Sequence, residues 1–139
     1  MSKVSVDSCP AGKWMDAAVA KALGWEDLHW KEVDRGLDHY ELWGWWGKGP
    51  NGECYLGKYY STDTAAAMEL EPKMPYFKLI RRAASLWQCQ SAFCGDWFDH
   101  LCSSCGCQFA DGETIPLAIS RAFLKAKGVK VIEIEEVLG

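Results

Sequence analysis

The 139-residue sequence contains no run of about 20 consecutive apolar residues, the length that a membrane-spanning helix needs. Residues 1–10 also lack the apolar segment of a secretory signal peptide. We therefore expect a cytoplasmic protein with no membrane partner. Disulfides are rare in a reducing cytoplasm, and seven cysteines, an odd number, cannot pair completely within one chain. The cysteines are interpreted as buried thiols, reactive thiols or metal ligands.

An excess of positive charge is also missing. The chain has 15 Lys and Arg residues against 19 Asp and Glu residues, a net charge of −4. Because Lys and Arg supply most of a protein's affinity for DNA, we expect no duplex nucleic acid as a partner. The sequence contains no Walker loop, Gly-x-Gly-x-x-Gly, His-Glu-x-x-His or Gly-x-Ser-x-Gly motif. These absences favour a binding protein over an enzyme.

The sequence contains 49% hydrophobic and 24% charged residues, which is enough apolar sequence to form one hydrophobic core. We find no internal repeat or linker, so residues 1–139 are expected to form a single domain. Hydrophobic periodicity predicts helices over residues 13–23, 61–70 and 115–126. Short alternating segments predict strands over residues 28–33, 40–46, 76–82 and 85–90. The sequence thus predicts an α+β fold.

The expected helices carry recognisable start and stop signals. Gly24 is a natural end for the first helix, and Pro72 is expected to end or kink the second. Thr114 can cap the third helix, with Pro116 in its first turn. The polar residues of that helix that we expect to face outward are Ser120, Arg121 and Lys125.

Two segments lack a clear period. Residues 91–110 are irregular and cysteine-rich, and we interpret them as an insertion that ends at a turn over Asp111-Gly112. Residues 129–139 are β-branched and acidic, and we interpret them as a C-terminal extension. For this extension a short strand and a helix both remain open.

Three segments together resemble the phage ABA-sandwich domain family of small phage proteins. The first runs from Gly12-Lys13-Trp14-Met15-Asp16-Ala17 to Leu23-Gly24-Trp25. The second is Tyr59-Tyr60-Ser61-Thr62-Asp63-Thr64-Ala65-Ala66-Ala67. The third is Ala110-Asp111-Gly112-Glu113-Thr114-Ile115-Pro116-Leu117-Ala118-Ile119-Ser120-Arg121-Ala122, similar to the family's Thr-Ala-Pro-Leu-Ala-Ile-Cys-Arg-Ala pattern. The three segments stand in the family's order.

The resemblance implies about three helices packed on a small antiparallel sheet, an α/β/α-type sandwich, and a phage or prophage origin. It implies the cytoplasm of a host cell as the location. It implies no catalytic residue, because the family has no established common activity. Ser120 stands where the family has Cys, and Pro72 interrupts the second helix. The glycine- and tryptophan-rich loop, the cysteine-rich insertion and the C-terminal extension look like additions to the family pattern, so we expect the specific function there.

The cysteine-rich insertion contains the spacing Cys-x7-Cys-x2-Cys-x-Cys. Four thiolates at ~2.3 Å satisfy a tetrahedral zinc ion, and Cys-x2-Cys is a common ligand spacing. The candidate ligands are Cys94, Cys102, Cys105 and Cys107, with Cys89 or His100 as substitutes. A structural zinc ion would also order a segment that lacks apolar periodicity.

Other interpretations of the cysteines remain open. The spacing from Cys105 to Cys107 is tight for a zinc knuckle, and unliganded thiols or a redox role fit the same residues. Cys89 lies in an expected strand, where a buried thiol is ordinary. The same segment also allows the hypothesis of a hydrolase, in which Cys102 or Cys105 is the nucleophile and His100 is the general base.

Aromatic residues are concentrated between residues 43 and 60. Alternation along a strand places Trp43 and Trp45 on one face and Trp46 on the other. Indole and phenol rings can stack on a nucleobase, and nearby lysines can bind its phosphates. The alternative is a structural role, in which the indoles of a hairpin fill the hydrophobic core. The candidate ligand-binding residues are Trp43, Trp45, Trp46, Lys48, Tyr55, Lys58, Tyr59 and Tyr60.

The absence of catalytic motifs favours a non-enzymatic binding protein, and the resemblance to the phage ABA-sandwich family implies that it is phage-encoded, with a role in host takeover or against host defence. One version sequesters a nucleotide-derived immune signal at the interface of a homo-oligomer. Another blocks a host protein through an exposed tryptophan face, since Trp dominates interface hot spots. A zinc- or thiol-dependent hydrolase and a purely structural module are the alternatives.

Overall fold

The computed structural model describes residues 2–34, 41–74, 77–91 and 108–134, and for residues 31–34, 41–43, 91 and 108 it describes the backbone alone. It confirms the α+β class. The elements in chain order are β1 (Ser2–Ser5), α1 (Lys13–Ala22), β2 (Glu26–Asp34), β3 (Glu41–Lys48), α2 (Thr64–Met68), a 3-10 turn (Glu71–Lys73), β4 (Lys78–Ala83), β5 (Leu86–Ser91), β6 (Gln108–Gly112), α3 (Ile115–Ala126) and β7 (Val131–Ile134).

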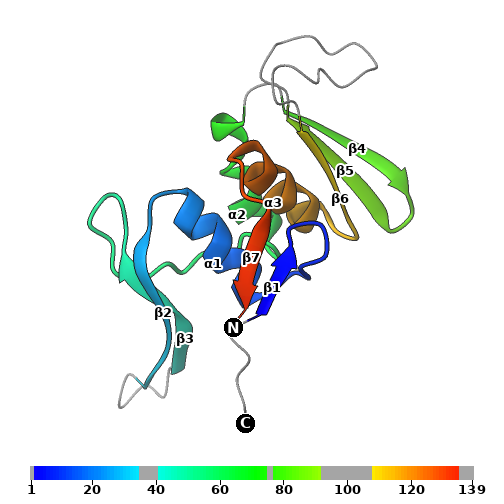
Figure 1. Cartoon of the computed structure of the whole chain (residues 1–139). Helices are drawn as coiled ribbons and strands as arrows, with labels where there is room; N and C mark the ends of the chain where they lie inside the picture. The colour runs from blue at the N-terminus through cyan, green and yellow to red at the C-terminus, as the bar shows by residue number, and fades with distance from the viewer. Residues whose placement is uncertain (1, 35–40, 75–76, 92–107, 135–139) are drawn as a thin grey trace.

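The strands in the described ranges form three small antiparallel sheets. The first pairs β1 with β7, the second pairs β2 with β3, and the third has the order β4-β5-β6. β1 and β7 lie side by side although they come from the two ends of the described chain (Figure 1). The extension after residue 128 therefore begins as a strand, over Val131–Ile134.

Helix α3 is the centre of the fold. It packs against β5 and β6 on one side and against α1 and α2 on the other (Figure 1). Ile119 and Phe123 of α3 and Met15 and Val19 of α1 are completely buried. Gly112 allows the close contact between α3 and the sheet, because a Cβ atom there would lie 2.6 Å from the Ala118 backbone nitrogen.

The start and stop signals act largely as predicted. α1 ends at Ala22, and Gly24 follows with φ 106°, a conformation that glycine adopts without strain. Asp63 caps α2 by accepting a hydrogen bond from the Ala65 N–H. Thr114 caps α3 by accepting from the Leu117 N–H, and Pro116 lies in the first turn.

Two local expectations are wrong. Ser120 was expected to face outward but is completely buried, where its hydroxyl donates to the Tyr60 carbonyl oxygen at 2.9 Å. Asp111 and Gly112 were expected to form a turn after irregular chain, but they complete β6, which pairs with β5 from residue 108 onward. The hydrogen bond to Tyr60 accounts for the buried position of Ser120, and pairing with β5 accounts for the strand at Asp111 and Gly112.

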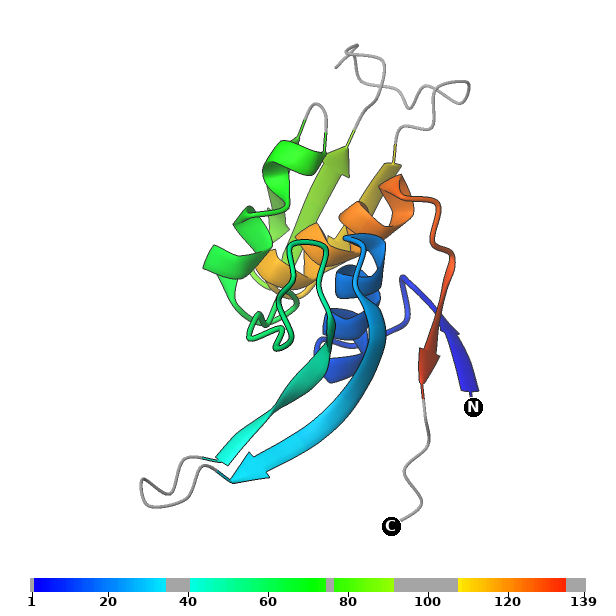
Figure 2. The same cartoon turned by 90° about the vertical axis from the view of Figure 1, so that its left-hand side faces the viewer.

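The β2–β3 hairpin forms a long curved ribbon that extends away from the helices (Figure 2). After β3 the chain turns at Gly52, which has φ 88°, and returns alongside β3. The return is held by hydrogen bonds from the Gly47 N–H to the Cys54 carbonyl and from the Leu56 N–H to the Trp45 carbonyl. The return segment therefore lies beside β3 on the side away from β2.

Candidate functional site

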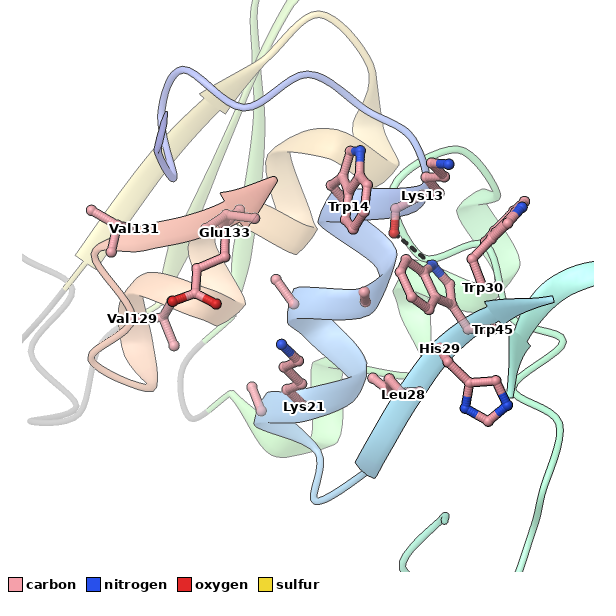
Figure 3. Close-up of a pocket in the computed structure, with 14 residues that line it drawn as sticks. Lys13, Trp14, Lys21, Leu28, His29, Trp30, Trp45, Val129, Val131 and Glu133 are labelled. Atoms are coloured by element: carbon pink, nitrogen blue, oxygen red, sulfur yellow. Dashed lines mark hydrogen bonds between the residues drawn. The ribbon is translucent and has the colours of Figure 1, made fainter. Parts of the chain in front are cut away.

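A groove of about 810 Å³ runs along the exposed side of α1, and we call it the α1 groove. Its floor is the helix itself, with Trp14, Ala18 and Lys21. One wall is β2, which includes Trp30, and the other is the chain of β7, which includes Glu133 (Figure 3). Small-molecule sites typically measure ~300–1,000 Å³, so the groove is large enough for a ligand of that kind.

Three indole rings form one cluster at the start of α1. The ring centroids of Trp14 and Trp45 are 5.4 Å apart with an interplanar angle of 62°. Those of Trp30 and Trp45 are also 5.4 Å apart, at 78°. The buried Trp45 is fixed by a 2.8 Å hydrogen bond from its Nε1 to the Lys13 carbonyl oxygen (Figure 3). This bond joins the hairpin to the first turn of α1.

Lys13 places a positive charge between two of these rings. Its Nζ atom lies 4.8 Å from the Trp30 ring centroid and 5.1 Å from that of Trp14. Lys21 lines the same groove two helical turns later. Within the described part of the chain neither lysine forms an ion pair, whereas Lys48 does. Among the described residues, the groove thus contains two lysines that form no ion pair, and Glu133 also lines it.

A second cavity of about 170 Å³ adjoins the groove, and we call it the small pocket. Lys13, Trp30 and Trp45 line both cavities. The small pocket is completed by Tyr55 and Tyr59, together with Asp16. The aromatic side chains of the hairpin and the return segment therefore surround a space beside α1.

The Asp16 side chain is buried beneath the small pocket and is held by Ser61. Its Oδ1 atom accepts hydrogen bonds from the Ser61 N–H at 2.8 Å and from the Ser61 hydroxyl at 2.7 Å. Burial raises the pKa of Asp16 above its ordinary value, while the two bonds from Ser61 act in the opposite direction. The Gly12 N–H donates to Ser61 Oγ at 2.9 Å, which links the same serine to the start of α1.

The position of Tyr55 depends on two glycines. A Cβ atom at Gly44 would lie 2.6 Å from the Tyr55 ring, and one at Gly57 would lie 3.3 Å from it. Trp46 packs on the ring with centroids 4.7 Å apart. Burial raises the pKa of Tyr55, and the neighbouring Tyr59 raises it further. The phenol therefore stays protonated and can act as a hydrogen-bond donor at neutral pH.

The structure gathers part of the predicted ligand-binding set. Trp45, Tyr55, Lys58 and Tyr59 line the small pocket, and Lys58 pairs with Glu69 at 2.9 Å. Trp46 packs on Tyr55, and Lys48 pairs with Asp27 at 3.6 Å; neither lines a described cavity. Tyr60 is buried in the core, and burial raises its pKa to about 12. The side chain of Trp43 lies outside the described residues.

The sequence interpretation missed the contribution of the first helix and of β2. Lys13 and Trp14 appear there only within the segment that resembles the phage family, and neither Lys21 nor Trp30 is given a role. A spacing signal does exist, because residues 14, 18 and 22 repeat every four positions and share one face of a helix. Two flanking lysines on that same side would have indicated a surface for an anionic ligand.

The predicted zinc ligands Cys94, Cys102, Cys105 and Cys107, and the substitute His100, lie outside the described residues. The other substitute, Cys89, is completely buried, and burial raises the pKa of its thiol to about 12. Among the residues that the structure does describe, no group of three or more His, Cys, Asp or Glu side chains is placed to hold a metal ion. The zinc site stays a prediction, and a zinc content below about half an equivalent per chain would contradict it.

None of the helices in the described ranges is long and apolar enough to cross a bilayer. No model of a known protein family matches the chain, and no curated protein sequence matches it significantly. The site is therefore interpreted from its own geometry.

Proposed function

We propose that this protein acts by binding, without turnover, and that its ligand is a nucleotide-like anion with an aromatic base. The observation that supports this most directly is the position of Lys13, between the Trp14 and Trp30 rings and without an acidic partner in the described residues. Base stacking on an aromatic ring contributes ~1–3 kcal/mol per base, and a nearby lysine attracts the phosphate.

The rest of the α1 groove suits such a ligand. Trp30 is 36% exposed, so its ring offers a face to an incoming base. Lys21 supplies a second cation along the floor, and Glu133 on the opposite wall can accept hydrogen bonds from ligand hydroxyl or amino groups. Charge and ring chemistry in the groove therefore complement a phosphate-bearing base.

The resemblance to the phage ABA-sandwich family suggests the setting for this activity. A phage protein that binds a nucleotide-derived immune signal would lower its free concentration and so protect the phage inside the host cell. Sequestration of a signal molecule requires tight binding but no catalysed reaction. This agrees with the absence of a catalytic motif in the sequence.

Isothermal titration calorimetry with mononucleotides and dinucleotides tests the proposal. We expect Lys13→Gln and Trp30→Leu to weaken binding about tenfold or more. Lys48→Gln is the matched control, because this lysine lines neither described cavity, and it should leave the affinity unchanged once its folding has been checked by circular dichroism.

If no nucleotide gives heat while a host protein co-purifies with the chain, the sequestration proposal is wrong and blockade of a host protein replaces it. Turnover of any nucleotide that is lost in Cys102→Ser or Cys105→Ser would instead favour the hydrolase. Native mass spectrometry of the purified protein reports the oligomeric state and any retained small molecule in the same measurement.

A further inference from the structure

The α1 groove and the small pocket are adjacent cavities, because Lys13, Trp30 and Trp45 line both of them. Trp30 and Trp45 meet edge to face at 5.4 Å, and the Nε1 bond to Lys13 fixes Trp45 in place. The shared side chains therefore lie at the junction of the two cavities. Of these three side chains, Lys13 alone carries a charge.

Each cavity is large enough for a planar ring. A cavity of about 150 Å³ accommodates benzene in another protein, and the small pocket measures about 170 Å³. The Trp45 indole and the Tyr55 ring both line it, and Gly44 and Gly57 leave room for the Tyr55 ring. The much larger α1 groove offers the face of Trp30 to a second ring.

The polar groups of the small pocket suit the edge of a base. Asp16 is anchored through one oxygen by Ser61, and a carboxyl group at this depth can bond to an exocyclic amino group, as carboxylates do with cytosine N4. Lys58, which also lines this pocket, is bonded to Glu69 at 2.9 Å and so carries no spare charge for a phosphate. A phosphate is therefore directed to Lys13, at the junction of the two cavities.

We propose that the ligand is a dinucleotide, with one base in the α1 groove, the second base in the small pocket and the linking phosphate at Lys13. This rests on the proposed function and narrows it from nucleotide-like anions to ligands with two bases. A mononucleotide whose base stacks on Trp30 in the α1 groove leaves the small pocket empty while its phosphate contacts Lys13. Affinity should therefore rise steeply when a second base is added.

Calorimetry with four defined probes tests this: AMP, GMP and the corresponding 3′–5′ dinucleoside monophosphates ApA and GpG. We expect at least one dinucleotide to bind about 5- to 150-fold more tightly than its mononucleotide, the gain from stacking one more base. Tyr59→Ala removes a rim residue of the small pocket that is 48% exposed, so the variant should fold normally. It should remove most of the dinucleotide's advantage and leave mononucleotide affinity unchanged.

Lys21→Gln is the matched variant for the other cavity, since Lys21 lines only the α1 groove. It should weaken both classes of probe by the same factor. Equal affinity for mononucleotides and dinucleotides, or a Tyr59→Ala variant that binds both as the wild type does, would overturn the dinucleotide inference and leave the proposed function standing. Absence of heat with all four probes would overturn both.

Discussion

The carboxyl group of Asp16 accepts two hydrogen bonds from Ser61, a residue 45 positions further along the chain. Both side chains are buried, with exposed fractions of 4% and 0%. The Ser61 hydroxyl also approaches the Gly12 carbonyl oxygen at 3.2 Å. One serine thereby joins the start of α1 to the segment that carries Tyr59, so the floor of the small pocket and part of its rim are fixed by the same contact.

The substitution Ser61→Ala should lower the free energy of unfolding by about 2–3 kcal/mol. The Asp16 carboxyl group loses the hydrogen bond from the hydroxyl and the Gly12 N–H loses its acceptor, whereas the bond from the backbone N–H of residue 61 remains. Urea denaturation followed by circular dichroism measures the change. The neighbouring Thr62→Ala is a matched control at an exposed position, with an expected change within about 0.5 kcal/mol. Equal stabilities for the two variants would contradict the assigned role of Ser61.

The pH dependence of stability should contain a contribution from Asp16. Because burial raises its folded-state pKa above the ordinary 3.8, the folded protein holds this proton more tightly than the unfolded chain does. The contribution is therefore fully present below pH 3.8 and is lost as the pH rises through the folded-state pKa. We expect the unfolding free energy of the wild type, relative to Asp16→Asn, to fall over this window.

Urea titrations of both proteins at a series of pH values measure that difference. Asn keeps an oxygen that can accept from Ser61 but has no proton to lose. A difference that increases with pH would show that the hydrogen bonds from Ser61 outweigh the burial of Asp16, contrary to the expected direction.

Trp45→Phe should lower the free energy of unfolding by about 1–3 kcal/mol. The substitution keeps a ring in the cluster but removes the donor that bonds to the Lys13 carbonyl oxygen at 2.8 Å. Trp14→Phe is the comparison, because it retains the edge-to-face contact with Trp45 and removes no hydrogen bond of that kind. Thermal and urea unfolding should show a larger loss of unfolding free energy for Trp45→Phe than for Trp14→Phe. The opposite order would contradict the prediction.

Alkylation by iodoacetamide should distinguish Cys54 from Cys89 in the folded protein. Cys54 is exposed, whereas Cys89 is buried and burial raises its thiol pKa to about 12. At pH 8 such a thiol is ionised in only about one molecule in ten thousand, and the thiolate is the reactive form. Peptide mass spectrometry should find Cys54 modified and Cys89 protected until denaturant is added. Rapid labelling of Cys89 in the folded protein would contradict its burial and favour its predicted role as a substitute metal ligand.

Helix α3 shows how much of the fold can be predicted from sequence. Thr114, Pro116 and the apolar spacing that follows define its start and its buried face, because these signals act within a few residues of one another. Ser120 was placed wrongly for a related reason. A hydroxyl group satisfied by the Tyr60 carbonyl belongs in the core, but that carbonyl lies 60 positions earlier and no local pattern reveals it.

The candidate site was less predictable than the fold. Trp45 and Tyr55, which the sequence analysis names as candidate ligand-binding residues, both line the small pocket. The α1 groove, in contrast, combines Lys13 from one helix, Trp30 from a hairpin and Glu133 from a strand near the other end of the chain. Only the pairing of β7 with β1 brings that last wall next to α1, and nothing in the local sequence specifies such a pairing.

That pairing also sets the order in which the site is assembled during synthesis. The three indoles and Lys13 lie between residues 13 and 45, whereas the wall containing Glu133 is translated after all of them and belongs to the strand that pairs with β1. Because chains emerge from the ribosome N-terminus first, a nascent protein exposes its rings before the groove has two sides. Ligand capture by the complete groove therefore requires synthesis through β7, and a chain truncated before Val131 lacks that wall.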